Sequence, residues 1–459
     1  MAHRSTRNLL AGRLVAACVI LGGLPPVARA AVDGSKSGPS LISLAVDGGE
    51  ADGASFTPAI SADGRYVAFT SAASTMVSGD TNGTEDVFVF DRVSHGTELV
   101  SRSSAGGQGH GDSYGPTISA DGRYVAFTSS AGDLTAGDGN SQLDIFVRDR
   151  VAETTILASV GPQGALGDGP SVAPSISADG RLVVFESDAR TLVPNDTNGT
   201  GDVFVYDIVT DLTRRLSVGG NGVETESPSF GPSISADGRS VAFESFSSRL
   251  VPDDTNGALD VFVADVPTGS VSRVSLATDG GQADNRSYSP SMSADGRIVA
   301  FASFANNLVA DDTNGLLDVF IRRRDQKTTT RLSVGPDGIQ GDGLSFAPVI
   351  SADGGLVVFS SEATTLVPGD SNGARDVFLA ATASRAMSRL SRSGAGRKAQ
   401  GDGPSLGPVV DASGVMVAFA SFATNLVPGD TNGQSDVFVT EGPSLKSGGG
   451  AGHKAKARK

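Results

Sequence analysis

The chain has 459 residues, of which 60 are Gly, 21 are Pro and 39% are hydrophobic, with one Cys and no Trp. This composition favours a fold with many tight turns and leaves enough apolar residues for a packed core. Residues 31–442 hold all 51 acidic side chains but only 27 of the 36 Lys and Arg, an excess of 24 negative charges. Such a surface repels phosphate backbones and anionic lipid, so we expect neither nucleic acid nor membrane as a partner.

Residues 1–30 have the pattern of a Sec signal peptide. Three arginines within residues 4–13 precede the apolar stretch LVAACVILGGL at 14–24, and the small residues ARA end at Ala30. Cleavage between Ala30 and Ala31 predicts a secreted or periplasmic protein. The apolar stretch is too short to span a bilayer as a helix, and no later segment is long or apolar enough to do so.

Cys18 is the only cysteine and lies inside this segment. The residues VAAC at 15–18 resemble a lipobox, but only four apolar residues separate Arg13 from Cys18, so we expect no lipid anchor there. A mature chain without cysteine forms no disulfide, and its stability must come from packing.

A nine-residue motif divides the chain into seven units. SADGRYVAF at Ser61 recurs with small changes at Ser119, Ser177, Ser235, Ser293 and Ser351, and as DASGVMVAF at Asp411. The spacing is 58 residues five times and 60 once. Each unit has four strand signals; in the third they are APSIS at Ala173, LVVFES at Leu182, DVFVYD at Asp202 and TRRLSVG at Thr213, with the hairpin turn ADGR after the first. This period predicts repeated four-stranded antiparallel sheets.

The ends of the repeat region indicate how the sheets are arranged. SLISLAV at 40–46 has the pattern of a fourth strand but precedes the first full unit, whereas the seventh unit ends after its third strand at DVFVTEG, 436–442. We therefore predict an all-β, seven-bladed β-propeller over residues 31–442, with the N-terminal strand completing the last blade. Closure leaves no open sheet edge, so we expect a monomer. The basic, Gly-rich residues 443–459 are predicted to be disordered.

Fourteen of the 21 Phe occupy two fixed positions, one on the second and one on the third strand of each unit. They are Phe69, Phe127, Phe185, Phe243, Phe301, Phe359 and Phe419, and Phe88, Phe146, Phe204, Phe262, Phe320, Phe378 and Phe438. This regularity predicts blade-to-blade core and not a ligand cage.

The SADGR hairpin followed by DVFV-x-D resembles the repeat of TolB-type, WD-like propellers of bacterial envelope and secreted proteins, over nearly all of residues 40–442. The resemblance implies a propeller that serves as a protein-binding platform. TolB-type propellers usually have six blades, however, and this chain has seven units and lacks the N-terminal partner domain of that family.

The loop between the second and third strands repeats an Asp, an Asn two residues later and a second Asp six residues after the first. The residues are Asp80, Asn82, Asp86; Asp138, Asn140, Asp144; Asp196, Asn198, Asp202; Asp254, Asn256, Asp260; Asp312, Asn314, Asp318; Asp370, Asn372, Asp376; and Asp430, Asn432, Asp436. Two interpretations stay open. The residues are typical of a self-bonded turn, with an Asx-turn at the first Asp, a left-handed bend at Asn-Gly and loop amides capped by the last Asp. They are also oxygen ligands suited to calcium, which needs six to eight of them.

The loop that joins neighbouring blades should emerge on the same face and carries its own repeated polar residue, six positions before a Pro. These residues are Asp52, His110, Asp168, Glu226, Asp284, Asp342 and Asp402, and we expect them to contact a ligand. Three positions before the Pro stands a serine in every unit, which we expect to bond loop backbone: Ser55, Ser113, Ser171, Ser229, Ser287, Ser345 and Ser405.

Two matches to the esterase pattern G-x-S-x-G, GDSYG at 111–115 and GPSLG at 403–407, lack the strand, turn and helix of a nucleophile elbow. The mature chain has only three histidines, so a Ser-His-Asp triad or a zinc site has little support. The sequence therefore favours a secreted, non-enzymatic binding platform for a protein or cell-envelope ligand. The alternative is a calcium-dependent propeller hydrolase or lactonase with central carboxylates, which should break the sevenfold pattern near the axis.

Overall fold

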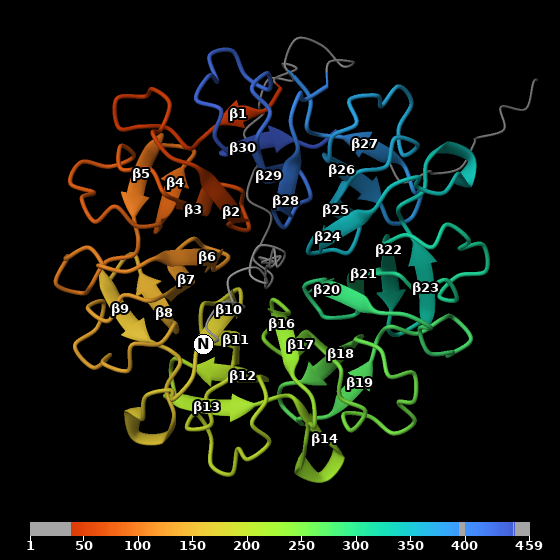
Figure 1. Cartoon of the computed structure of the whole chain (residues 1–459), viewed down its shortest axis with the longest axis horizontal. Helices are drawn as coiled ribbons and strands as arrows, with labels where there is room; N and C mark the ends of the chain where they lie inside the picture. Colours follow the sequence, from red (N-terminus) through yellow and green to blue (C-terminus); the bar gives the residue numbers. More distant parts are fainter. Residues whose placement is uncertain (1–37, 394–399, 444, 446–459) are drawn as a thin grey trace, which may run out of the picture.

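The computed structural model describes residues 38–393, 400–443 and 445. Seven four-stranded antiparallel sheets surround a central axis, each with its first strand innermost (Figure 1). The all-β, seven-bladed propeller predicted from the repeat is confirmed. The predicted signal peptide, residues 1–30, and residues 444 and 446–459 of the predicted tail lie outside the described residues.

The blades follow one another along the chain. Blade 1 contains β2 (Ser55–Ile60), β3 (Tyr66–Ser71), β4 (Asp86–Asp91) and β5 (Gly96–Leu99); blade 2 contains β6 (Ser113–Ile118), β7 (Tyr124–Ser129), β8 (Asp144–Asp149) and β9 (Thr154–Leu157); blade 3 contains β10 (Ser171–Ile176), β11 (Leu182–Ser187), β12 (Asp202–Asp207) and β13 (Leu212–Arg215). Blade 4 contains β16 (Ser229–Ile234), β17 (Ser240–Ser245), β18 (Asp260–Asp265) and β19 (Val271–Arg273); blade 5 contains β20 (Ser287–Met292), β21 (Ile298–Ser303), β22 (Asp318–Arg323) and β23 (Thr328–Arg331); blade 6 contains β24 (Ser345–Ile350), β25 (Leu356–Ser361), β26 (Asp376–Ala381) and β27 (Met387–Arg389).

Blade 7 is built from both ends of the repeat region. It contains β28 (Ser405–Val410), β29 (Met416–Ser421), β30 (Asp436–Glu441) and, outermost, β1 (Ser40–Leu41). Strand β1 pairs antiparallel with β30, and the Ile42 amide extends the pairing by donating to Val437 O at 2.9 Å. The prediction that residues 40–46 supply the fourth strand of the last blade is therefore confirmed.

The SADG motif forms the turn between the first and second strands. In blade 1, Asp63 Oδ1 accepts from Ser61 Oγ at 2.7 Å and from the Arg65 amide at 2.9 Å. Gly64 has a φ of 71°, which glycine adopts without steric strain. The motif is thus a self-bonded hairpin turn, as its Asp-Gly pair predicts.

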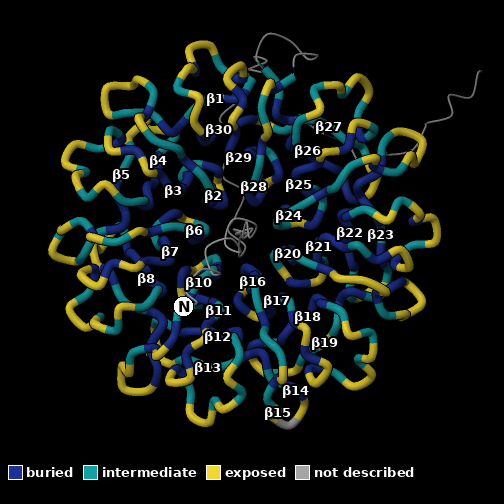
Figure 2. Tube along the Cα trace, in the orientation of Figure 1, coloured by how far each residue is buried: buried dark blue, intermediate teal, exposed yellow. Residues whose placement is uncertain are grey.

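The repeated phenylalanines form the core. All fourteen are fully buried, and the two of each blade stand opposite one another on neighbouring strands with ring centroids 5.8–6.1 Å apart. Phe127 and Phe146 of blade 2 share a cluster with Val87 and Val89 of blade 1, so the rings also fill the space between blades. Buried residues follow the sheets, and exposed ones follow the outer loops (Figure 2).

Backbone hydrogen bonds join neighbouring blades at both faces. At one face the amide of the first inner-strand residue donates to the loop of the preceding blade, as from Ser113 to Glu85 O and from Ser55 to Ser435 O, each at 2.7 Å. At the other face the SADG turns are linked, with Ala62 donating to Ala120 O at 3.0 Å and Ala412 of the last blade to Ala62 O at 3.2 Å. The SADG motif therefore forms the hairpin turn of its own blade and also links neighbouring blades.

The loops between blades contain small elements that the sequence did not predict. They are a two-stranded ribbon, β14 (Val218–Gly219) and β15 (Val223–Glu224), and the 3₁₀ turns η2 (Pro162–Gly164), η3 (Gly220–Gly222) and η4 (Pro336–Gly338). Segments of two or three residues are too short to show a hydrophobic period. No helix in the described part of the chain is long and apolar enough to cross a membrane.

Candidate functional site

Two sets of loops meet on one face of the ring, which we call the loop face. In blade 1, residues 72–85 join the second and third strands, and residues 100–112 lead to the next blade. Asn82 Nδ2 donates to Gly109 O at 2.9 Å, and the Thr81 amide donates to Gln108 Oε1 at 3.2 Å. The prediction that both loops share a face is confirmed, and the two loops hold each other in place.

The Asp-Asn-Asp loop forms the predicted Asx-turn, but the residue whose side chain forms it is not the predicted one. Asn82 Oδ1 accepts from the Thr84 amide at 3.1 Å, and its Nδ2 donates to Asp86 Oδ2 at 2.8 Å, while Gly83 has a φ of 67°. Thus Asn82, and not the first Asp of the loop, forms the Asx-turn. Asp86 is fully buried at the start of β4 and accepts from the side chains of Asn82, Gln108 and Ser101, whereas the sequence predicts that it caps loop amides.

A serine two residues after the end of the fourth strand completes this arrangement in every blade. In blade 7, Ser43 Oγ donates to Asp436 Oδ1 at 2.6 Å and accepts from the Val437 amide at 3.0 Å. The same pair of bonds is made by Ser101, Ser159, Ser217, Ser275, Ser333 and Ser391. The signal was present in the sequence as the constant Ser of the LSVG-like fourth strand, but it was not recognised as the partner of the Asp.

An arginine lies between the two loop carboxylates of blades 3–6. Arg215 Nη1 is 3.0 Å from Asp196 Oδ1 and 3.1 Å from Asp202 Oδ2. The equivalent nitrogens of Arg273, Arg331 and Arg389 lie 2.8–2.9 Å from the first Asp and 3.3–3.5 Å from the second. In these four blades an internal guanidinium therefore balances the carboxylates that the sequence offers as calcium ligands.

The loop carboxyls are buried enough to resist ionisation. Burial raises the pKa of Asp196 and Asp312 to about 6, although a neighbouring arginine opposes the shift in both cases. The pKa of Asp430 is also raised to about 6, by burial and then by the negative charges of Asp436 and Glu50. A cation in the loop would relieve this cost.

The acidic side chains of the loops between blades lie exposed on the loop face and accept hydrogen bonds from other residues of the same chain. Asp342 accepts from the Thr364 amide and hydroxyl, both at 2.6 Å. Asp52, Asp168, Glu226, Asp284 and Asp402 cap the same loop in their own blades. His110 reverses the roles, since its amide donates to Asp133 Oδ1 at 3.1 Å. Their predicted contact with a ligand stays a prediction, with the added fact that each has an internal partner.

The serines three positions before the Pro have a structural role, but not the predicted one. Each begins an inner strand, is fully buried and pairs its hydroxyl with a serine hydroxyl at the end of the second strand, as Ser55 Oγ does with Ser71 Oγ at 2.9 Å. The partner serine bonds the loop backbone instead, since Ser71 Oγ accepts from the Ala73 amide at 3.1 Å. Ser113 and Ser405 of the two esterase-like matches belong to this set.

Aromatic side chains gather where the inner strands meet the loop face. We call them the aromatic crown: Phe56, Tyr114, Phe230, Phe246, Tyr288, Phe304, Phe346 and Phe422. Phe56 of blade 1 packs against Phe422 of blade 7 with ring centroids 6.1 Å apart, and Phe230 packs edge-on against Phe246 at 6.3 Å. Phe246 is 39% exposed and Phe422 40%. This group was not singled out from the sequence, although five of its members, Phe56, Tyr114, Phe230, Tyr288 and Phe346, each follow the repeated inner-strand serine by one position.

Two glutamates break the sevenfold pattern near the axis. Glu186 Oε2 accepts from the Gly231 amide at 2.8 Å, and Glu244 Oε1 accepts from the Ser289 amide at 2.6 Å. In blade 1 the same contact is made by a threonine hydroxyl, Thr70 Oγ1, with the Gly115 amide at 3.1 Å. The glutamates therefore share a blade-joining role with Thr70.

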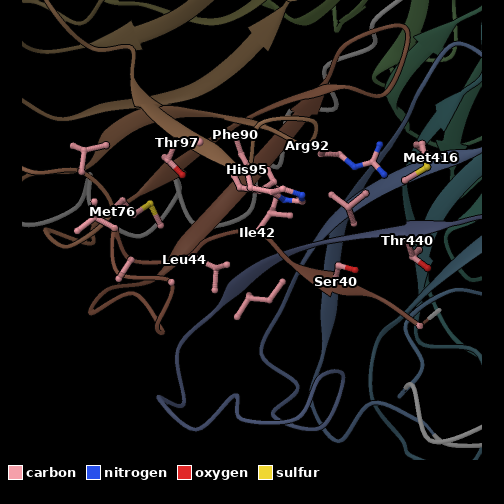
Figure 3. A pocket seen from close by; sticks show the side chains of 18 of the residues that line it. Ser40, Ile42, Leu44, Met76, Phe90, Arg92, His95, Thr97, Met416 and Thr440 are labelled. Atoms are coloured by element: carbon pink, nitrogen blue, oxygen red, sulfur yellow. The ribbon is translucent and has the colours of Figure 1, made fainter.

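A cavity of about 640 Å³ lies at the outer edge of the ring, where blade 7 meets blade 1 (Figure 3). Ile42, Leu44 and Met76 line its apolar part, and Arg92 and His95 line its polar part. The cavity follows the path of the closing segment, away from the aromatic crown.

The similarity of this chain to known proteins is found in its structure and not in its sequence. No protein-family model matches the chain, and neither does any curated protein sequence. TolB from Acinetobacter baumannii matches 60% of this chain and 53% of its own, with 18% identity and a TM-score of 0.36. This chain thus spans about half the length of that TolB.

Two further structures match over more of this chain. Oligogalacturonate lyase from Vibrio parahaemolyticus matches 86% of this chain and 92% of its own, with 14% identity and a TM-score of 0.52. Acylaminoacyl peptidase from Pyrococcus horikoshii matches 84% of this chain and 51% of its own, with 11% identity and a TM-score of 0.50. At these identities the lyase and peptidase matches support the fold alone, which the sheet topology identifies as a β-propeller.

Proposed function

We propose that this protein is a secreted, non-enzymatic binding platform that holds a protein or cell-envelope ligand on its loop face. The observation that carries the proposal is the aromatic crown. Phe246 and Phe422 expose about two fifths of their surface although fourteen other phenylalanines are fully buried in the same fold. Partly exposed aromatic side chains grouped on one surface are typical of binding sites, because they offer a large contact area at little cost in side-chain entropy.

The surroundings of the crown indicate the chemistry of the ligand. The exposed acids Asp52, Asp168, Glu226, Asp284, Asp342 and Asp402 lie in the loops that lead into the inner strands. A ligand with an apolar anchor and a basic or neutral polar rim would complement this surface, whereas a polyanion would be repelled. Secretion by the signal peptide of residues 1–30 would bring the platform to such ligands outside the cytoplasm.

A comparison of the two faces tests the proposal. The protein is immobilised and exposed to secreted and envelope fractions of its source, and captured proteins and glycans are identified. Phe246→Ser with Phe422→Ser removes two exposed crown residues. The matched control is Val93→Ser with Val151→Ser, because these valines are 70% and 74% exposed in turns on the opposite face.

We expect a specific ligand that is captured by the parent and the valine control and lost by the phenylalanine variant. A ligand retained equally by all three proteins would contradict binding at the crown. Turnover of the captured ligand by the parent would contradict the non-enzymatic part of the proposal.

A further inference from the structure

The seven Asp-Asn-Asp loops differ in what lies between their two carboxylates. In blades 3–6 one arginine nitrogen, Nη1, faces Oδ1 of the first Asp and Oδ2 of the second, and the guanidinium belongs to a residue 13 positions after the second Asp. In blade 1 the position holds Leu99, and Gln108 Nε2 donates to Asp80 Oδ1 at 2.7 Å and to Asp86 Oδ2 at 3.0 Å. Each of these five carboxylate pairs is therefore bridged by a donor from the chain.

Blade 7 has the same carboxylates as blade 3 but lacks the arginine. In blade 3, Glu224 caps Thr197 and also accepts from Arg215 Nη2 at 2.9 Å. In blade 7, Glu50 caps Thr431 in the same way, with Oε2 accepting from Thr431 Oγ1 at 2.9 Å. The residue that corresponds to Arg215 is Leu41, on the closing strand.

The atoms that face the guanidinium in blade 3 are left with fewer partners in blade 7. Asp430 is only 5% exposed, and within the described residues its buried Oδ1 has no hydrogen-bond partner. Asp436 Oδ2 keeps its bond from Asn432 Nδ2, at 3.3 Å, but has no counterpart of the arginine bond that Asp202 Oδ2 accepts. In blade 7 two aspartates, with Glu50 in the adjoining loop, thus flank a position that an arginine nitrogen fills in blades 3–6.

We propose that blade 7 binds a divalent cation, Ca²⁺, between Asp430 Oδ1 and Asp436 Oδ2, in the place that the arginine nitrogen takes in blades 3–6. The described residues contain no group of three acidic, His or Cys side chains already arranged around a metal. The two aspartates are therefore the anchoring ligands, and Glu50, loop carbonyls and water supply the rest. Calcium suits such a site because it accepts mixed oxygen ligands and irregular geometry.

The location gives the cation a role in closing the ring. Glu50 follows the closing strand β1, whereas Asp430 and Asp436 lie before and at the start of β30, 380 and 386 residues later in the chain. A cation shared by these residues would hold the closing segment to the last blade. This role does not depend on the proposed function of the loop face.

Direct calcium titration by calorimetry and thermal unfolding in calcium or EDTA, at constant ionic strength, test the proposal. We expect the parent to bind calcium, and a hundredfold excess over Kd to raise the ratio of folded to unfolded protein about 100-fold. Asp430→Asn should lose this binding. Leu41→Arg should also lose it and unfold at the same temperature in calcium and in EDTA, because the new guanidinium takes the place of the ion.

A matched change in blade 3 tests the same reasoning in the opposite direction. Arg215→Leu gives blade 3 the residues of blade 7, so this variant should gain a calcium site that Asp196→Asn removes. Blade 2 is the comparison with two carboxylates and no third: it has Leu157 in place of the arginine and Leu166 in place of Glu50, and among the described residues its buried Asp138 Oδ1 and Asp144 Oδ2 have no hydrogen-bond partner either. Binding that survives Asp430→Asn and disappears in Asp138→Asn would place the ion in blade 2 and overturn the assignment. A parent that binds no calcium at millimolar concentration, with the same unfolding temperature in both buffers, would overturn the proposal altogether.

Discussion

Replacing Ser43 by alanine would remove the bonds that fasten the closing strand to blade 7. Ser43 is fully buried, and its hydroxyl joins Asp436 Oδ1 at 2.6 Å and the Val437 amide at 3.0 Å. The substitution leaves a buried carboxylate oxygen and a buried amide without these partners while removing only one atom from the core. Its effect is therefore mainly the loss of two hydrogen bonds.

The size of the effect follows from the two bonds. A buried donor left unpaired costs about 1–3 kcal/mol, and a hydrogen bond to a charged group contributes about 1.5–3 kcal/mol. We expect Ser43→Ala to lower the free energy that holds β1 on β30 by roughly 3–5 kcal/mol. Ser217→Ala is the matched control, because Ser217 makes the same bonds to Asp202 and Val203 in blade 3, whose fourth strand follows its third through a short turn.

Hydrogen exchange followed by mass spectrometry separates local opening from global loss of stability. In Ser43→Ala, amides of residues 436–441 should exchange about 100 to several thousand times faster than in the parent, since each 1.4 kcal/mol corresponds to a factor of about ten. In Ser217→Ala the same peptide should be protected nearly as well as in the parent. Exchange of residues 436–441 within a factor of three of the parent in Ser43→Ala would refute the view that this bond holds the ring closed.

Two further predictions concern the hairpin turns on the face opposite the loops. The Arg123 guanidinium lowers the pKa of Asp149 to about 2, so the pair stabilises the fold fully above the ordinary carboxyl pKa of about 4 and loses this contribution as the pH falls toward 2. Arg123→Met should therefore reduce the dependence of the unfolding temperature on pH between about 2 and 4. The effect should be small because the arginine is partly exposed, and an unchanged pH profile would contradict this. Gly122→Ala should destabilise the fold more than Gly83→Ala in chemical denaturation: both glycines have positive φ, but only at Gly122 would a Cβ meet another group, the Tyr66 ring at 2.2 Å. Equal losses of stability in the two variants would contradict this, because they would mean that the turn at Gly122 shifts away from the Tyr66 ring at no cost.

The sequence predicted the fold because each structural signal is local and occurs seven times. The Asp-Gly turn and the alternating strands each act within a few residues, the paired phenylalanines recur at fixed positions in every unit, and the 58-residue period counts the blades. Even the closing strand was predictable, because residues 40–46 keep the pattern of a fourth strand.

The candidate site was predicted less completely because its decisive contacts join residues far apart in the sequence. Asp202 meets an arginine 13 residues later, and Asp342 caps a loop 22 residues later. Nothing in the Asp-Asn-Asp motif itself distinguishes blade 7 from blade 3; the difference is Leu41 against Arg215 on another strand. The aromatic crown was missed although its members recur at the repeat spacing, because the repeat does not distinguish exposed aromatic positions from buried ones.

The blade joined from both ends of the repeat region has the same strand pairing, serine bonds and turn contact as the blades made from continuous chain. Its fourth strand pairs in the same register, its serine binds the same aspartate, and its SADG-type turn donates to the first blade as the other turns do to their neighbours. A blade therefore forms these contacts whether or not its four strands are continuous in the chain. If residues 442 and 38 were linked, the chain ends could be moved to another outer turn and the ring should still fold. The protein is in this respect a scaffold for circular permutation, in which the position of the ends could be chosen to leave any one blade as the one that opens.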